Sequence, residues 1–398
     1  MKIAILTASF LPKVGGAQVF SYNIGQQFDA EGHQVTIYIP AENYKALDER
    51  FRGLLYPLPQ RFYGLVRRIP ILGLYLARRF LLHQQWKENF DVWLVVATFP
   101  SGYVATCLQG QTPIILRASG EDIQKDPILN YGYRLDSKKE ASITETVNKY
   151  DRLVALTESV RADFLELGVP DNVVSIIPNG VDIKRFKRTK KRRQLRYDLE
   201  WPTDKPVILT TGRNHRKKGY DQIPEIAELL KNQGLIYQWY IVGKGSEKID
   251  LELQRRGLQD CVKTLGEIGI DRSQQKEWQF PNSELVAMYQ AADIYAFPSL
   301  LETFGMVQLE AMAAGAAVIS TDAPGCRDVV THEFNGLSAR AGDAHSFAEQ
   351  LGRVLKDEEL RERLSKNAMT FIEEYGWSQI AKSYEALFCT VIGKGNLN

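Results

Sequence analysis

Short apolar runs rich in β-branched residues alternate with stretches of helical periodicity along most of this chain. Such uninterrupted apolar runs are typical of strands that are buried on both faces, as in a parallel sheet. Strands that alternate with helices therefore predict an α/β fold with helices on both faces of its sheets. A first set of expected strands comprises Ile3–Leu6, Val35–Ile39, Val92–Val96, Ile114–Leu116, Leu153–Leu156 and Val173–Ile177. A second set comprises Val207–Thr210, Tyr237–Val242, Val262–Leu265, Ile294–Phe297 and Val318–Ser320, with helices such as Asp221–Lys231 and Ser283–Ala291 between them.

Length and composition restrict the chain to ordinary globular classes. At about 150 residues per domain, its 398 residues predict two or three domains. A hydrophobic content of 44% with 25% charged residues argues against disorder, collagen and coiled coil. The net charge of +2 argues against a protein that coats nucleic acid, although local basic patches remain possible. The four cysteines form no C-x-x-C pair, which excludes a disulfide scaffold and a zinc ribbon and suits a reducing cytoplasm.

Neither apolar segment that could suggest a membrane protein fits that class. The first ten residues are interpreted as a strand rather than a signal peptide, because their apolar run is short and Pro12 follows. Four arginines interrupt the segment Leu65–Leu82, so it is not expected to cross a bilayer. We expect a cytoplasmic protein, with peripheral contact to the membrane left open.

A basic stretch separates the two sets of expected strands. Lys184–Arg196 holds nine Lys or Arg residues and no acid, and Pro202 and Pro206 follow. A core element is not expected to carry that charge density, so we place a domain junction there. The predicted organisation is a first domain at 1–183, a basic linker at 184–202, a second domain at 203–376 and a C-terminal segment at 377–398. That segment holds a helix near Ser378–Leu387 that is expected to return to the first domain. Two doubly wound sheets would bind ligands in a cleft at the carboxyl ends of their strands.

A glycine pair follows the first expected strand. Gly15 and Gly16 allow a sharp turn and a close approach to a ligand. The N–H groups at the start of the following helix favour an anion. The alternative is an ordinary turn between a strand and a helix, and the spacing is not that of a G-x-G-x-x-G dinucleotide fingerprint.

A basic loop, Gly212–Gly219, follows the strand expected at Val207–Thr210. It brings Arg213 and Lys218 to the carboxyl end of a strand. An Arg fork and a Lys point charge suit a diphosphate whose negative charge grows as it departs. The loop lacks the pattern of a Walker loop, and a solvated basic loop is the alternative.

Two glutamates in the segment Pro298–Ala313 are the most informative feature. A strand ends before this segment, a turn follows, and a helix is expected from about Phe304. Glu302 would lie in the turn beside the helix N-terminus, and Glu310 about two turns inside the helix. The two carboxylates would then face one cleft from different depths. The alternative is a Glu stabilised by the helix dipole together with a solvated helical Glu.

Taken in order, these motifs resemble those of glycosyltransferase family 4, the retaining nucleotide-sugar glycosyltransferases with the GT-B fold. The Glu302-x7-Glu310 element with its Glu-Ala-Met-Ala ending is similar to the family signature. Further similar segments are Ile177–Asp182, Ala291–Asp293, Phe297–Ser299, Ala314–Gly315, Gly325 and Asn335–Leu337. The resemblance covers most of the chain. It implies an α/β fold of two Rossmann-like, doubly wound parallel-sheet domains that face a central cleft, the first for the acceptor and the second for the nucleotide-sugar donor.

The resemblance also implies roles for individual residues. Arg213 and Lys218 match the pair that holds the donor diphosphate. Glu310 matches the residue that binds the ribose hydroxyls, and Glu302 the one that contacts the transferred sugar. Catalysis would then depend on Glu302, Arg213 and Lys218. The implied donor site comprises Gly15, Gly16, Arg213, Lys218, Phe304, Gly305, Met306, Val307 and Glu310, with backbone N–H groups at the helix start on the sugar and phosphate.

No Asp-x-Asp motif and no His/carboxylate cluster at metal spacing is found in the sequence. We therefore expect no metal and no cofactor besides the nucleotide diphosphate sugar itself. Arg213, Lys218 and a helix N-terminus would stabilise the leaving diphosphate by preorganised electrostatics. Retention without an obvious nucleophile resembles the family's front-face route, in which the departing phosphate accepts the proton of the acceptor.

One loop departs from the family pattern. Many members carry a histidine in a His-Gly-x-Asp pattern after the strand expected here at Ile114–Leu116. This chain reads Arg-Ala-Ser-Gly-Glu-Asp from Arg117 to Asp122, with Ser119 at the histidine position. Ser119 and Asp122 are therefore candidates for contacting the sugar or the acceptor, without a direct transfer of the histidine's role.

Two basic segments remain. From Arg50 to Lys87 the chain has no acid, and basic, aromatic and leucine residues are interleaved. This composition, centred on Tyr56–Phe80, suits an interfacial helix on anionic lipid; a helix packed on the first sheet with a solvated basic face is the alternative. Lys184–Arg196 is interpreted as a solvated linker, with a membrane or nucleic-acid patch as the alternative.

The predicted function is transfer of a sugar from a nucleotide diphosphate donor to a glycan or lipid-linked acceptor, with retention of anomeric configuration. The donor is UDP more often than GDP in this family, and the pathway would be surface polysaccharide or glycolipid biosynthesis. A sugar epimerase or phosphorylase of the same fold is the first alternative. A non-enzymatic nucleic-acid binder is the second, but it leaves Glu302 and Glu310 unexplained, so no nucleic-acid partner is expected.

Overall fold

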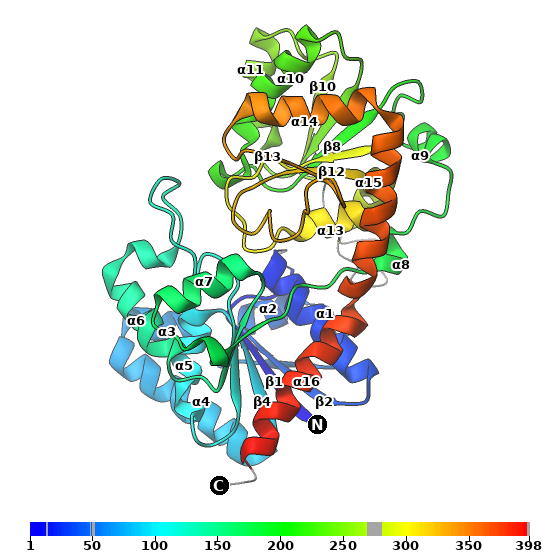
Figure 1. The fold of residues 1–398 in the computed structure, drawn as a ribbon. Helices are drawn as coiled ribbons and strands as arrows, with labels where there is room; N and C mark the ends of the chain where they lie inside the picture. Colours follow the sequence, from blue (N-terminus) through cyan, green and yellow to red (C-terminus); the bar gives the residue numbers. More distant parts are fainter. Residues whose placement is uncertain (13–14, 48, 50–51, 269–280, 396–398) are drawn as a thin grey trace. The chain divides into compact units, whose positions relative to one another are not determined.

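The computed structural model describes residues 1–12, 15–47, 49, 52–268 and 281–395. Arg50, which opens the acid-free segment, lies outside the described residues. The chain divides into two compact units, one formed by Met1–Gly180 with Trp377–Asn398 and the other by Val181–Gly376 (Figure 1).

The first unit is built on a seven-stranded sheet with the order β3-β2-β1-β4-β5-β6-β7. All neighbouring strands are parallel. The strands are β1 (Lys2–Thr7), β2 (Gln34–Ile39), β3 (Leu55–Pro57), β4 (Val92–Val96), β5 (Ile114–Arg117), β6 (Arg152–Ala155) and β7 (Val174–Ile176). The strand order reverses between β1 and β4, which is where open α/β sheets bind their ligands.

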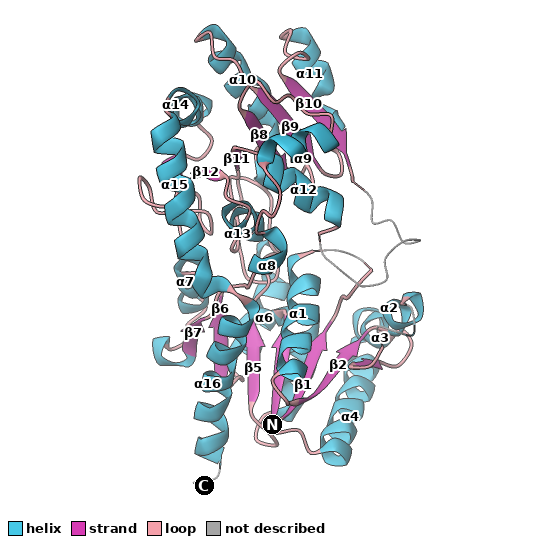
Figure 2. Ribbon diagram, turned by 90° about the vertical axis from the view of Figure 1, so that its right-hand side faces the viewer, coloured by secondary structure: helices cyan, strands magenta, loops and turns pink. Residues whose placement is uncertain are grey.

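Helices cover both faces of this sheet (Figure 2). The N-terminal helices are α1 (Gly16–Ala30), α2 (Ala41–Ala46), α3 (Phe62–Arg68), α4 (Pro70–Glu88), α5 (Tyr103–Ala105), α6 (Ser137–Val147) and α7 (Glu158–Glu166), and the C-terminal helix is α16 (Trp377–Gly395). Buried side chains of α4, α5, α6 and α7 form one core with the sheet. The C-terminal helix α16 packs on α1 through aromatic contacts such as that between Phe20 and Tyr384, with ring centroids 5.7 Å apart.

The second unit repeats this plan on a six-stranded parallel sheet with the order β10-β9-β8-β11-β12-β13. The strands are β8 (Val207–Thr211), β9 (Gln238–Val242), β10 (Val262–Gly266), β11 (Ile294–Ala296), β12 (Ala317–Thr321) and β13 (Leu337–Ala339). The helices are α8 (Ile183–Phe186), α9 (Arg192–Asp198), α10 (Ile223–Asn232), α11 (Asp250–Arg255), α12 (Ser283–Ala291), α13 (Met306–Ala313), α14 (Ala344–Lys356) and α15 (Glu358–Phe371). Here the strand order reverses between β8 and β11.

The predicted fold of two parallel, doubly wound sheets is confirmed. The expected strands recur within a few residues, and the helix expected at Ser283–Ala291 has those bounds. The prediction missed β3 and β13, which are three-residue strands at sheet edges. Neither contains a β-branched residue, unlike the edge strands β7 and β10, which were predicted, so neither leaves the expected kind of apolar run in the sequence.

The basic stretch differs from its description as a linker. Residues 184–202 belong to the second unit and contain α8 and α9. Arg196 is buried, and its guanidinium forms an ion pair with Asp293 and donates to the carbonyl of Ala291 at 3.0 Å. Arg192 pairs with the same carboxylate at 3.0 Å. A core element can therefore carry this charge where a half-buried carboxylate and carbonyls receive the guanidinium groups.

In the part of the chain that the structure describes, no helix combines the length and apolar character needed to cross a bilayer.

Candidate active site

The loops that follow β8 and β11 meet at the order reversal of the second sheet. The hydroxyl oxygen of Ser299 lies 2.9 Å from the carbonyl oxygen of Lys217, and the N–H of Leu300 donates to the same carbonyl at 2.7 Å. Gly219 has a φ of +65°, and a Cβ there would lie 2.0 Å from the carbonyl oxygen of Pro298. Only glycine fits at such a close approach with a positive φ. The basic loop and the Glu302 loop are therefore fixed to one another.

Buried Glu302 and half-buried Lys218 form an ion pair between these loops. Ser299 donates to the same carboxylate at 3.1 Å, and Lys217 lies 4.0 Å from its other oxygen. Burial alone would raise the pKa of Glu302, but the charges of Lys218 and Lys217 and the hydrogen bonds from Lys218 and Ser299 outweigh it. The pKa of Glu302 therefore lies below its ordinary value, and the carboxylate is charged at neutral pH.

A third loop, after β12, supports the backbone of Glu302. The N–H of Glu302 donates to the carbonyl of Pro324 at 2.9 Å. Gly325 has a φ of +76°, and a Cβ there would lie 2.2 Å from the carbonyl oxygen of Glu302. Gly325 thus allows the loop after β12 to lie directly against the backbone carbonyl of Glu302.

The helix α13 begins directly after this carboxylate. Phe304 is buried, Gly305 caps the helix with a φ of +73°, and Met306 and Val307 form its half-buried first turn. The first N–H groups of a helix have no carbonyl partner within it and carry positive potential. The start of α13 therefore carries positive potential a few residues after the carboxylate that pairs with Lys218, while Arg213 is an exposed residue of the same basic loop as Lys218.

Glu310 lies in α13, within a separate polar group. Burial raises the pKa of Glu310 to about 7, against a hydrogen bond with Tyr289 and the charge of Arg185, although the residue as a whole is only half-buried. The hydroxyl of Tyr289 also contacts the hydroxyl of Thr211 at 2.5 Å. Arg185 has its pKa lowered by burial, and among the described residues its Nη2 atom has no hydrogen-bond partner. A buried donor without a partner commonly indicates that a ligand or water completes the site.

In the first unit, Asp122 organises the loop after β5. Its carboxylate accepts the N–H groups of Ser119 at 2.9 Å, Gly120 at 2.7 Å and Thr98 at 2.7 Å. The third of these bonds reaches the loop after β4, at the order reversal of the first sheet. Burial raises the pKa of Asp122, and the backbone hydrogen bonds oppose that rise. Asp122 therefore fixes the shape of the loop by receiving backbone donors.

Ser119 lies against Arg117, a buried residue at the end of β5. Arg117 donates to the Ser119 hydroxyl at 3.3 Å and to the Asn179 side chain at 2.5 Å, and its guanidinium carbon lies 3.8 Å from the ring centroid of Phe20. The position where the family pattern has a histidine is thus contacted by a guanidinium. Gly15 and Gly16 lie at the start of α1, after β1, with Gly15 in an extended conformation.

The structure brings some of the predicted residues together and leaves others apart. In the second unit, Lys218, Glu302 and the helix start are adjacent, whereas Glu310 lies further along α13. Ser119, Asp122 and the glycine pair belong to the first unit. The sequence analysis missed the roles of Ser299, Tyr289 and Arg185. Tyr289 looked like a core residue of its helix, and Arg185 belonged to a run interpreted as solvated, so neither gave a local signal.

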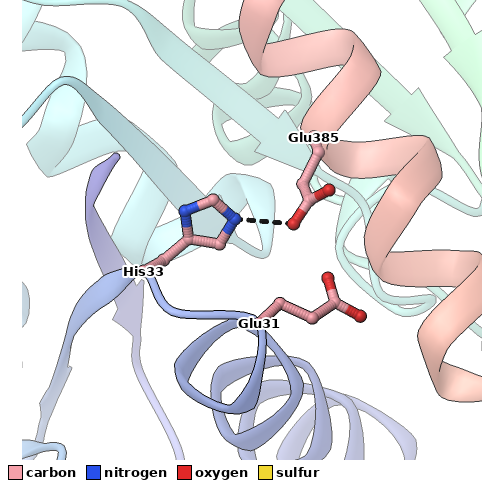
Figure 3. Close-up of side chains that lie close together, drawn as sticks. All are labelled: Glu31, His33 and Glu385. Atoms are coloured by element: carbon pink, nitrogen blue, oxygen red, sulfur yellow. Dashed lines mark hydrogen bonds and ion pairs between the residues drawn. The ribbon is translucent and has the colours of Figure 1, made fainter.

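One group of side chains in the first unit has the residue types of a metal site. A ring nitrogen of His33 and one carboxylate oxygen each of Glu31 and Glu385 all lie within 4.8 Å of one another (Figure 3). His33 Nε2 is 2.6 Å from Glu385, and its Nδ1 is 3.1 Å from the amino group of Met1. Gln27 donates to Glu31 at 2.7 Å. Protein groups thus contact both ring nitrogens, and the cluster joins the end of α1 to α16.

Two parallel sheets with the same strand order, each with polar loops at its order reversal, form the architecture of GT-B glycosyltransferases. A solved structure from Anabaena, Alr3699/HepE in complex with UDP, has this fold with a TM-score of 0.78, 19% identity, and coverage of 98% of this chain and 100% of that one. The sucrose-phosphate synthase of Thermosynechococcus elongatus gives a TM-score of 0.77 at 21% identity, with 99% of each chain covered.

The sequence comparisons define the family. The model "Glycosyltransferase Family 4" matches residues 14–185, and the model "Glycosyl transferases group 1" matches residues 191–371. Together they cover nearly all of both units. The chain belongs to glycosyltransferase family 4, and its fold is of the GT-B type.

Curated relatives show the range of reactions within this similarity. A D-inositol 3-phosphate glycosyltransferase of Xylanimonas cellulosilytica is 30% identical over 60% of this chain and 56% of its own length. An N,N'-diacetylbacillosaminyl-diphospho-undecaprenol alpha-1,3-N-acetylgalactosaminyltransferase of Campylobacter jejuni is 29% identical over 58% of each chain. The match spans a little over half the length of such relatives.

Proposed function

We propose that this glycosyltransferase moves a sugar from a UDP-sugar to a glycan or lipid-linked acceptor, with retention of anomeric configuration and without a metal ion. One observation carries the proposal: the ion pair of half-buried Lys218 with buried Glu302, just before the start of α13 and at the order reversal of the second sheet. This arrangement suits a leaving diphosphate next to a sugar.

Lys218, Arg213 and the N–H groups at the start of α13 would receive the diphosphate. Charge on the leaving oxygens grows as the bond to the sugar breaks, so fixed positive groups stabilise the transition state more than the bound donor. Preorganised donors of this kind do not have to reorient during the reaction. They supply the charge that a divalent cation would otherwise contribute, which is the basis for proposing a metal-independent reaction.

Glu302 would contact hydroxyls of the transferred sugar while holding Lys218 in place. Its contacts with Lys218 and Ser299 leave it better suited to orient groups than to attack the anomeric carbon. In the front-face route, the acceptor oxygen bonds to that carbon on the side from which the phosphate departs. The proton of the acceptor passes to the departing phosphate oxygen, so charge and atoms balance without a protein nucleophile.

Glu310 would accept hydrogen bonds from the ribose hydroxyls, with Arg185 as a further donor to the nucleotide. UDP is the preferred nucleotide because the Anabaena structures contain UDP, UDP with glucose, and UDP-glucose. The Campylobacter relative is named for a diphospho-undecaprenol substrate, which supports a lipid-linked acceptor. A cytoplasmic enzyme at the membrane surface, in surface polysaccharide or glycolipid synthesis, would meet such an acceptor there.

The test is a donor panel on the purified full-length chain. We expect thermal stabilisation by UDP and by one or more UDP-sugars, since a ligand at 100 times its Kd adds about 2.7 kcal/mol to the folded state. UDP release should require an acceptor, should persist in EDTA, and should yield a product whose anomeric proton coupling matches that of the donor. Epimerised donor without UDP release would overturn the transfer reaction, and an inverted product would overturn retention.

A further inference from the structure

The helix α4 exposes an apolar face along its whole length. Its inward face is buried through Gly73, Ala77, Leu81, Gln84 and Gln85. Gly73 faces the backbone of α3, and Gln84 and Gln85 form hydrogen bonds with Tyr38 and Trp93 of the sheet. Seven large apolar side chains of α4 and the residue before it are exposed instead, at fractions from 39% for Leu82 to 89% for Ile71. They are Ile69, Ile71, Leu72, Tyr75, Leu76, Leu82 and Trp86.

These exposed positions form one continuous surface, which we call the α4 outer face. At 3.6 residues per turn, positions 71, 72, 75, 76, 79, 82, 83, 86 and 87 fall within a single arc of about 160°. All nine are exposed, and the inward positions occupy the opposite side. A helix that is apolar on both sides is ordinarily buried all round. This helix buries one side only, so its second apolar side indicates a partner surface.

The polar residues of the α4 outer face are basic or neutral. Arg79 donates to the Tyr75 hydroxyl at 3.3 Å, the rings of His83 and Trp86 stack with centroids 5.8 Å apart, and Lys87 pairs with Glu88 at 3.1 Å. At the N-terminal end of the helix, α3 contributes exposed Arg67 and Arg68. Among the described residues, no carboxylate lies within ion-pair distance of Arg67, Arg68 or Arg79.

We propose that the α4 outer face lies on the surface of an anionic lipid bilayer. A helix parallel to the membrane plane inserts its apolar side chains at the boundary between headgroups and acyl chains, and its arginines meet the lipid phosphates. Tryptophan and tyrosine prefer this boundary because one end of each ring system is apolar and the other is polar. Arginines without carboxylate partners complement a negatively charged leaflet.

A second copy of the chain fits this face less well. A two-fold interface would bring the same face of each subunit together. Arg79 of both copies would then approach one another within an arc that contains no acid.

The structure also changes the surface expected from the sequence, which was centred on Tyr56–Phe80. Phe62 and Tyr63 are buried, and Trp86 adds a highly exposed aromatic side chain beyond Phe80.

The test is co-sedimentation of the full chain with phosphatidylcholine vesicles that contain either no phosphatidylglycerol or about 30 mol % of it. We expect binding to the anionic vesicles that falls as salt is added, because screening weakens the attraction. Ile71→Asn with Trp86→Ser, and separately Arg68→Gln with Arg79→Gln, should each lower the partition coefficient about tenfold. Ile128→Asn, at an isoleucine that is 83% exposed outside α4, is the matched control and should bind like the native chain.

Several results would overturn the proposal: no binding to either vesicle, equal binding to both, or equal loss in the Ile128→Asn control. Light scattering of the vesicle-free protein provides a further check. A dimer that dissociates in the Ile71→Asn, Trp86→Ser variant would assign the face to a second copy. The vesicle assay contains no nucleotide sugar, so its failure leaves the proposed transfer reaction untouched. Loss of sugar transfer with intact vesicle binding would contradict the proposed function and would leave the proposed membrane contact of the α4 outer face supported.

Discussion

The two sheets share one strand order but use the loops at their carboxyl ends differently. In the second unit, the loops after β8 and β11 bring the charged side chains Lys218 and Glu302 together. In the first unit, the loop after β5 uses its carboxylate, Asp122, to receive backbone N–H groups. The first arrangement creates a centre of charge, and the second creates a fixed loop shape. A buried acid in a motif can therefore serve chemistry or architecture, and its partners distinguish the two.

The largest expected effect is on turnover, from removal of the charge centre. Lys218→Ala should lower kcat for sugar transfer about 100- to 1,000-fold, because loss of one preorganised donor to a developing negative charge has effects of this size. Lys217→Ala removes an ammonium that lies 4.0 Å from the other carboxylate oxygen and should lower kcat less than about tenfold. Steady-state kinetics with saturating donor would measure both.

A double variant separates the catalytic effect from a folding effect. Lys218→Ala leaves the buried Glu302 carboxylate with weaker compensation, so the free energy of unfolding should fall as well. Lys218→Ala with Glu302→Gln removes both charges and should recover much of that stability without recovering turnover. If turnover returned with stability, Lys218 would act only through the fold, and the contrast between the two loops would disappear.

The next effect is on stability, from the loop in the first unit. Asp122→Ala leaves three backbone donors without their acceptor and should lower the free energy of unfolding by about 3 kcal/mol. Asp126→Ala is the control, because that carboxylate accepts a single N–H, from Leu129 at 2.8 Å, and should lose about 1 kcal/mol. Urea denaturation would measure both. Equal losses of unfolding free energy in the two variants would mean that the three hydrogen bonds of Asp122 stabilise the fold no more than the single hydrogen bond of Asp126.

The sequence predicted most of the fold and part of the site, and its failures have physical causes. Strands rich in β-branched residues were predictable, including the edge strands β7 and β10, whereas β3 and β13 contain no β-branched residue and were not. The motifs located Lys218 and Glu302 because glycines and charges cluster after their strands. They did not reveal that Asp122 faces backbone donors, nor that Arg196 is buried against Asp293. The pairings of Asp122 with Thr98 and of Arg196 with Asp293 join residues far apart in the chain, and one sequence carries no record of them.

A smaller effect is expected at Glu310, which tests whether a second acid of the second unit also serves the ligand. Its pKa is raised to about 7, and a carboxylate accepts hydrogen bonds from ribose hydroxyls better than a neutral acid does. The affinity for UDP should therefore rise with pH through about 7. Glu310→Gln should weaken UDP binding about tenfold, or about 1.4 kcal/mol, and remove this pH dependence. Calorimetry would compare it with Glu284→Gln, an exposed glutamate of α12.

The raised pKa of Glu310 also makes the stability of the fold depend on pH. The folded chain keeps the Glu310 proton to higher pH than the unfolded chain, whose ordinary value is 4.5. The folded state thus binds more protons between about 4.5 and 7, and the contribution of this group to stability falls as pH rises across that range. Glu310→Gln should flatten that part of the curve of unfolding free energy against pH. A slope identical to that of the native chain would assign the pH dependence to other groups.

The smallest expected effect concerns Ser119, where the shape of the side chain rather than its charge would select the donor sugar. Arg117 lies 3.3 Å from the Ser119 hydroxyl, so an imidazole introduced by Ser119→His would have its pKa lowered by the guanidinium and remain neutral near pH 7. A neutral imidazole reaches further than a hydroxyl and can donate or accept one hydrogen bond. We expect Ser119→His to raise the ratio of kcat/KM for UDP-glucose over UDP-xylose, which lacks the C6 group, by about threefold. Ser119→Ala, which adds no reach, should leave the ratio nearly unchanged. An unchanged ratio in Ser119→His would show that position 119 does not read that part of the donor sugar.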